Sequence, residues 1–137
     1  MPDSKPKPTQ FIRAVGRRKT SIARVRLHPG KGDNTINDQS VSRYFQDPAY
    51  ELEFLAPFQA VNAIGKVYVT VKVSGGGKHS QIQAVVHGIA RAFVKQNAEL
   101  KTKLKKKNLT TRDPRMKERR KAGYAQSARA RKQSPKR

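Results

Sequence analysis

Residues 66–96 read KVYVTVKVSGGGKHSQIQAVVHGIARAFVKQ and carry the clearest structural pattern of the chain. From Lys66 to Ser74, valines at every second position alternate with polar side chains, which predicts a strand with one buried face. The three glycines that follow predict a turn. From about Ser80 to Gln96 the apolar residues have the spacing of an amphipathic helix, and they are Ile82, Val85, Val86, Ile89, Phe93 and Val94. A strand, a glycine turn and a helix therefore form the predicted centre of the fold.

Upstream of this centre, the sequence predicts a second half-buried strand over residues 21–27. Small and apolar residues there alternate with Ile22, Arg24 and Arg26. Arg24 and Arg26 share the outward face about 6.6 Å apart. Such a row of guanidinium groups can lie along a phosphodiester backbone, and the alternative is a solvated polar face. Residues 34–36 are a candidate short strand.

A first helix is predicted where Asp47 precedes Pro48, because an acidic N-cap followed by proline is typical of a helix start. We expect this helix to run through Phe54. Pro57 is expected to interrupt it, and Gly65 to close a second short helical piece.

A last, basic helix is expected after Asn97, with Leu100 and Leu104 as its apolar anchors. The resulting order of strands and helices predicts an α+β fold, in which helices cover one face of a sheet.

The charge of the chain points to a polyanionic partner. The 137 residues include 31 Lys and Arg against 9 Asp and Glu, a formal net charge of +22. A protein of this size with this charge repels itself unless counter-ions or a polyanion surround it. Nucleic acid is the favoured partner, and an anionic membrane is less favoured.

The charge also divides the chain into three predicted regions. Residues 101–137 hold 16 Lys and Arg and 2 acids, a net +14, and large apolar residues become rare after Leu109. We therefore expect a flexible arm at 1–9, a globular RNA-binding body at 10–107 and a long basic C-terminal extension at 108–137.

Several classes of protein are disfavoured. The absence of cysteine excludes disulfides and cysteine-ligated zinc, and the three histidines do not have a metal-ligand spacing. No cofactor is expected. No apolar run is long enough for a membrane span, and we expect no secretory leader because the first ten residues are polar. A cytosol-like compartment follows as an expectation.

The turn at Gly75, Gly76 and Gly77, followed by Lys78, is the sharpest local motif. Amides at a helix N-terminus attract phosphate, and a lysine adds charge. The P-loop pattern fails, because His79 follows Lys78 and the glycine spacing differs. The remaining interpretations are a contact to an RNA phosphate, which the charge favours, and a plain connection between strand and helix.

Further candidate RNA-binding residues come from two basic segments. One is the run Arg17, Arg18 and Lys19 beside the strand at 21–27. The other is the extension, with Arg112, Arg115, Lys117, Arg119, Arg120, Lys121, Arg129, Arg131 and Lys132. A stripe of His87, Arg91 and Lys95 on the long helix is either a further RNA contact or a solvated face. An enzyme acting on RNA or nucleotides and a DNA-architectural protein are the alternative functions, but no convincing acid or metal site lies near Lys78.

Four segments, in order and at compatible spacings, resemble the ninth small-subunit ribosomal protein of the bacterial and organellar type. They are GRRKTSIARV at 16–25; GGG at 75–77 with Gln81 and HGIARA at 87–92; LTTRDPRMKERR at 109–120; and the terminal Lys136-Arg137. The chain departs from the usual family pattern at Ala14, at His79-Ser80 and at Ser134-Pro135.

The resemblance implies a small β-α-β sandwich like the second domain of the fifth small-subunit ribosomal protein, with a left-handed crossover. It implies binding to small-subunit ribosomal RNA and neighbouring proteins in the subunit head, without catalysis. It also implies that the tail reaches toward peptidyl-site tRNA, with Lys136 and Arg137 near its anticodon stem-loop. A bacterial cytoplasmic ribosome is expected, and an organellar one is less favoured.

Overall fold

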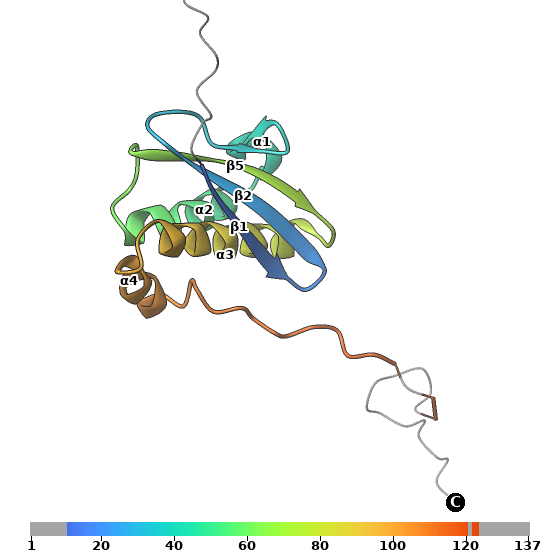
Figure 1. Cartoon of the computed structure of the whole chain (residues 1–137). Coiled ribbons are helices and arrows are strands. Elements are labelled where there is room, and N and C mark those ends of the chain that lie inside the picture. Colours follow the sequence, from blue (N-terminus) through green and yellow to red (C-terminus); the bar gives the residue numbers. More distant parts are fainter. Residues whose placement is uncertain (1–10, 121, 124–137) are drawn as a thin grey trace, which may run out of the picture.

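The computed structural model describes residues 11–120, 122 and 123. Five strands form one sheet in the order β1-β2-β5-β3-β4 (Figure 1). The three long strands β1, β2 and β5 pair antiparallel, whereas β3 runs parallel to β5 and pairs antiparallel with β4. Their bounds are β1 Ile12–Arg18, β2 Ser21–Pro29, β3 Thr35–Ile36, β4 Gln39–Ser40 and β5 Val67–Ser74.

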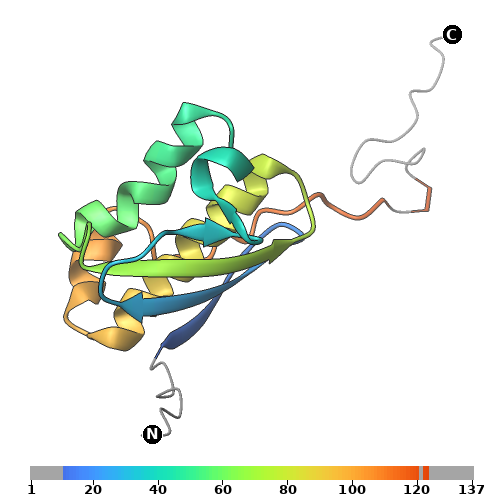
Figure 2. The same ribbon diagram turned by 90° about the horizontal axis from the view of Figure 1, so that it is seen from above.

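The helices gather on one side of the sheet, as Figure 2 shows for α2 and α3. They are α1 Val41–Tyr44, α2 Pro48–Ala60, α3 Lys78–Gln96 and α4 Leu100–Lys106. The core lies between the two layers, where Val25 and Val71 of the sheet and Ile82 and Ile89 of α3 are at most 2% exposed. The predicted mixed α+β fold with one covered sheet face is confirmed.

Helix α3 lies directly against β1 because both contribute glycine where they meet. A Cβ atom on Gly16 would overlap the carbonyl oxygen of Ala84 and the backbone of Gly88. A Cβ on Gly88 would in turn press on Val25. The two backbones therefore approach more closely than any larger residue allows, and this contact fixes where the outer strand lies on the helix.

The prediction that Pro57 interrupts the first helix is wrong. Helix α2 continues through Pro57 to Ala60, and no second helical piece precedes Gly65 within the described residues. A proline inside a helix removes one backbone hydrogen bond. Here that loss falls in the last turn, and Pro57 is buried together with Phe54 and Phe58, so its packing keeps the helix continuous.

Strand β1 is absent from the sequence predictions. Its inward positions are Ala14, Gly16 and Arg18, which do not form the alternation of large apolar side chains that marks β2 and β5. After β3 the chain passes through β4, α1 and α2 and then forms β5, which is parallel to β3. The left-handed sense of that crossover stays a prediction.

Candidate nucleic-acid interface

The face of the sheet turned away from the helices carries most of the strand cations. Cross-strand partners lie on the same face of a sheet, so the register defines successive rows. One row is Arg13, Arg26 and Thr70; the next is Val15, Arg24 and Lys72; the third is Arg17, Ile22 and Ser74. The outward positions of Arg24 and Arg26 confirm the predicted alternation of β2. We call this surface the open sheet face.

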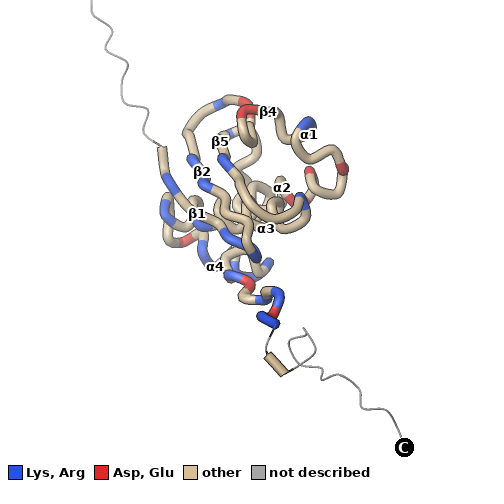
Figure 3. The backbone as a smooth tube through the Cα atoms, turned by 90° about the vertical axis from the view of Figure 1, so that its right-hand side faces the viewer, with Lys and Arg blue, Asp and Glu red and all other residues tan. Residues whose placement is uncertain are grey.

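The open sheet face has a large excess of positive charge. Arg13, Arg17, Arg24, Arg26 and Lys72 are all exposed, and Figure 3 marks such positions along the strands. Among the described residues, Lys72 is the one of these five that contacts a carboxylate, that of Asp38 at 2.6 Å. Both members of that pair are well exposed, so the pair stabilises the protein little. Like charges opposite each other destabilise a sheet, so this face suits an external anion.

Two motifs that are far apart in the sequence meet at one end of the sheet. The tip of the β1–β2 hairpin is formed by Lys19, with a φ of 53°, and Thr20. Gly75, with a φ of 78°, lies so close that a side chain there would press on the Thr20 carbonyl. The absence of a side chain at Gly75 allows this close approach. The hairpin tip and the glycine turn therefore form one surface.

Buried serines hold the glycine turn in place. The Ser21 hydroxyl donates to the Gly75 carbonyl at 2.9 Å and lies 2.8 Å from the Ser80 hydroxyl, which in turn bonds the Gly77 carbonyl. The carbonyls of Gly75 and Gly77 therefore accept hydrogen bonds from buried serine hydroxyls. The backbone amides of the first turn of α3 have no acceptor within the helix.

The lysine beside the glycine turn is already engaged. The ammonium of Lys78 lies 3.3 Å from the ring centroid of Tyr44 and 5.8 Å from that of Phe45. The Tyr44 hydroxyl also donates to Gln81 of α3. Lys78 is exposed and charged, and the aromatic ring fixes its direction.

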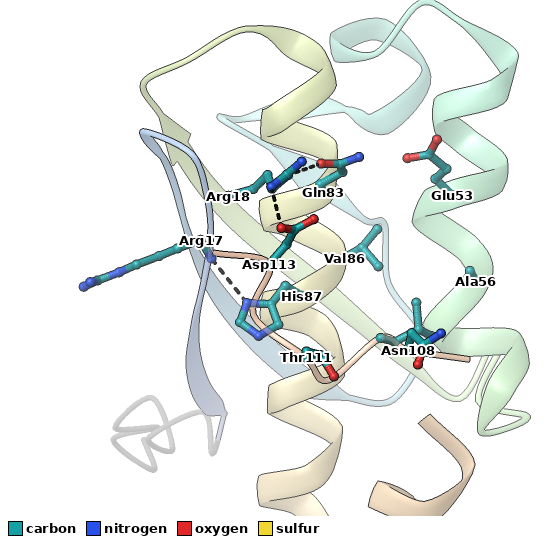
Figure 4. A pocket seen from close by; sticks show the side chains of 11 residues that line it. Arg17, Arg18, Glu53, Ala56, Gln83, Val86, His87, Asn108, Thr111 and Asp113 are labelled. Carbon is teal, nitrogen blue, oxygen red and sulfur yellow. Dashed lines mark hydrogen bonds and ion pairs between the residues drawn. The ribbon is translucent and has the colours of Figure 1, made fainter. Parts of the chain in front are cut away.

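Arg18 differs from its neighbours because it points toward α3 and is buried. Its Nε donates to Gln83 at 2.6 Å, and its Nη1 lies 3.0 Å from Asp113 (Figure 4). The same Nη1 donates to the Arg115 carbonyl at 3.1 Å. The guanidinium of Arg115 also donates to both oxygens of the Asp113 carboxylate. These hydrogen bonds and charges, chiefly those of Arg115, lower the pKa of Asp113 well below its ordinary value. Arg18 thus ties the start of the extension to β1.

The extension therefore begins docked on the body. The chain after α4 runs back along α3, and Leu109 packs against the core (Figure 1). A cavity of about 270 Å³ lies between this segment, α2 and α3, and its lining includes Glu53, Val86 and Asp113. The predicted limit of the body at residue 107 follows the end of α4, and the contacts of 109–115 continue beyond it.

The stripe on α3 lies along the outer edge of β1. The Arg17 amide donates to Nδ1 of His87 at 3.4 Å, so the ring carries its proton on Nε2, which donates to the Thr110 carbonyl. Arg91 donates to the Val15 carbonyl, and Lys95 donates to the Arg13 carbonyl. Burial lowers the pKa of His87, the Thr110 carbonyl opposes this, and Arg91 and Arg112 lower it further.

The geometry of a helix and a strand explains this match. Four helical residues advance about 6 Å, and two strand residues advance about 6.6 Å. Side chains four residues apart on α3 therefore meet the backbone of every second residue along β1. The stripe supplies hydrogen bonds that an edge strand otherwise lacks, a role that sequence analysis did not consider.

The other predicted RNA-binding residues fall into two groups. Lys117, Arg119 and Arg120 are exposed, whereas Arg112 is half-buried and donates to the Asp113 carbonyl. The remaining candidates lie outside the described residues, and they are Lys121, Arg129, Arg131, Lys132, Lys136 and Arg137. In the part of the chain that the structure describes, no group of three or more His, Asp or Glu could hold a metal ion. No described helix is long and apolar enough to cross a membrane.

Arg13 is not among the residues predicted from the sequence. Its signal was weak, because the neighbouring inward position is Ala14 and the strand has few large apolar residues. Arg13 lies four positions before Arg17, and residues separated by an even number lie on the same face of a strand. This spacing was the available indication that Arg13 lies on the open sheet face.

A comparison with known families identifies the family of the chain. A sequence model of the family described as Ribosomal protein S9/S16 matches residues 16–137, which is most of the chain. The match covers the hairpin tip, the glycine turn and the docked extension, the three segments that the fold brings together. The chain therefore belongs to the ribosomal protein S9/S16 family and is a structural, RNA-binding protein of the ribosome.

Proposed function

We propose that this protein is a structural constituent of the small ribosomal subunit that binds small-subunit ribosomal RNA in the subunit head. The observation that carries the proposal is the open sheet face, where five exposed cations have one carboxylate contact among the described residues. Such a face is costly in isolation and favourable against a phosphate backbone.

The remaining predicted contacts extend this interface. Lys19 and the glycine turn continue it at one end of the sheet, and Lys117, Arg119 and Arg120 continue it along the extension. Neighbouring proteins of the head complete the proposed set of partners. Arg18 takes a different part, because its charge is matched inside the protein and it positions the extension.

The test measures binding to a transcript of the head region of small-subunit ribosomal RNA over a range of salt concentrations. Replacing Arg17 and Arg24 by Gln should weaken binding and reduce the slope of log K against log salt by about 1.4–1.8, because two phosphate contacts are lost.

A matched control separates the face from the total charge. Ala49→Glu with Gln59→Glu also lowers the net charge from +22 to +20, but both residues lie exposed on α2, behind the sheet. The control should keep a slope close to that of the parent. Equal losses in the two double variants would contradict binding through the open sheet face.

We further propose that Lys136 and Arg137 reach toward tRNA in the peptidyl site. The support for this proposal is the sequence alone, because both residues belong to residues 101–137, which carry a net charge of +14. Subunits assembled with a protein lacking both residues should sediment normally and hold peptidyl-site tRNA less tightly. Exchanging the two, Lys136→Arg with Arg137→Lys, should preserve tRNA binding, and undiminished binding by the deletion variant would contradict the proposal.

A further inference from the structure

Beyond the general charge of the open sheet face, one place on it brings two arginines together. Arg13 of β1 and Arg26 of β2 are direct cross-strand partners. The Cζ atom of Arg13 lies 5.0 Å from the centroid of the Phe11 ring, and that of Arg26 lies 5.2 Å from the same centroid. Two like charges thus share one aromatic ring.

The charge of this pair is unmatched inside the described part of the chain. Neither guanidinium has a carboxylate within 4.0 Å there. Like charges in directly opposed positions repel each other across a sheet. Attraction to the ring holds each cation in place but neutralises neither. An external anion between them would remove the repulsion.

The ring itself is held by a fixed stack. Phe11 lies 5.5 Å from the ring of His28, which stacks on Tyr68 at 4.8 Å with an interplanar angle of 12°. The His28 Nε2 atom lies 3.0 Å from the Thr70 hydroxyl, and the backbone at Gly32 covers Tyr68. This row runs from the residue before β1 across β2 to β5, beside the two arginines.

The properties of the neighbouring histidine agree with a cationic site. Burial lowers the pKa of His28, and the positive charge of Arg26 lowers it further. The imidazole therefore remains neutral at pH 7 and adds no third charge. It supports the ring and leaves the two guanidiniums as the charged groups.

We propose that Phe11, Arg13 and Arg26 form a phosphate clamp, in which both guanidiniums bind one phosphodiester group of the RNA and the Phe11 ring holds each of them in place. The clamp rests on the proposed function, since it assigns one phosphate position within the RNA interface. Arginine suits this site because its planar fork can donate to two phosphate oxygens.

A double-mutant cycle tests whether one phosphate is shared. Arg13→Gln and Arg26→Gln should each weaken binding to the head-region transcript about tenfold, and the double variant should lose far less than the hundredfold that independent contacts predict. Additive losses would overturn the clamp while leaving the interface intact. Undiminished binding by both single variants would also overturn it, and would favour an acidic protein segment as the occupant.

The ring has its own test. Phe11→Leu keeps both charges but removes the aromatic face, so affinity should fall while the salt slope stays at the parental value. Phe11→Tyr restores a ring and should restore affinity. Equal affinity in the leucine variant and the parent would remove Phe11 from the clamp.

A measurement without RNA excludes a purely structural role. Arg13→Gln should raise the melting temperature of the free protein by about one or two degrees, since it removes repulsion from Arg26. A clear decrease would mean that the pair stabilises the sheet, which would overturn the proposal. Failure of the proposed function itself would appear in the Arg17 and Arg24 double variant, which leaves the clamp residues unchanged.

Discussion

The open sheet face and the stripe on α3 look alike in the sequence, yet they differ in what their charges meet. Arg24 and Arg26 alternate along β2 and project away from the helices. Arg91 and Lys95 recur on α3 and donate to backbone carbonyls of β1. Regular spacing of cations therefore does not identify an RNA contact. A cation is available for RNA when the fold places no acceptor of the protein itself within hydrogen-bond distance.

The largest effect should come from breaking the contact on which the stripe depends. Gly16→Ala places a methyl group against the α3 backbone, where neither side can move freely. We expect β1 to be displaced and the free energy of unfolding to fall by about 3 kcal/mol or more. Chemical denaturation measures this loss.

Gly77 provides the control for that variant, because a Cβ atom there meets nothing within 4 Å and the residue is the N-cap of α3. Gly77→Ser should leave stability unchanged or slightly raised. Parental stability of Gly16→Ala would show that β1 and α3 do not need their close approach.

The two regions also differ in how far they were predictable. Strands at 21–27 and 66–74 and the helix at 80–96 were predicted because large apolar side chains recur there at a single period. The outward direction of Arg24 and Arg26 followed from that period. Strand β1 has no such signal, since its inward positions are Ala14, Gly16 and Arg18.

The burial of charge was not predictable from local spacing. Arg18 looked like one member of a basic run, but its carboxylate partner, Asp113, comes 95 residues later. The stripe acquires its acceptors in the same way, from a strand that precedes it by more than 70 residues. Such pairings depend on the tertiary fold, so the sequence left the stripe open between two roles and missed a third.

Removing the extension should have the next largest effect. Truncation after residue 107 deletes Leu109 from the core margin and leaves Arg18 without Asp113 and His87 without Thr110. The body should still unfold cooperatively, because its main core lies between the sheet and α3, but its melting temperature should fall by about 5–10 °C.

A longer fragment serves as the comparison. Truncation after residue 117 keeps the segment that contacts β1 and α3 and should melt close to the full chain. Identical melting of the two fragments would mean that the docked segment adds no stability.

The pH dependence of stability should report the one stripe residue that can titrate in the neutral range. The folded protein lowers the pKa of His87, mainly by burial. Below the ordinary value of about 6.5 the unfolded chain takes up a proton that the folded chain resists. Stability should therefore be constant at higher pH and decrease as the pH falls below that value.

Melting curves between pH 7.5 and 5.5 test this dependence. His28, whose pKa is also lowered, contributes in the same direction, so His87→Gln should reduce the loss without abolishing it. A parental loss in His87→Gln would contradict the role of His87 at the β1 edge.

The smallest effect, and the sharpest use of the comparison, is expected for Arg91→Met with Lys95→Met. This variant lowers the net charge by two, as the Arg17 and Arg24 variant does, but it changes side chains that are bonded to the protein's own backbone. Loss of two hydrogen bonds at an exposed edge should cost about 1–2 kcal/mol of stability in total, since water can replace the donors. RNA affinity should stay close to that of the parent.

A loss of affinity matching that of the Arg17 and Arg24 variant, with stability unchanged, would mean that the stripe binds RNA as the open sheet face does. Retained affinity with lowered stability would instead mean that regularly spaced cations bind RNA on the open sheet face and hydrogen-bond a strand edge on α3.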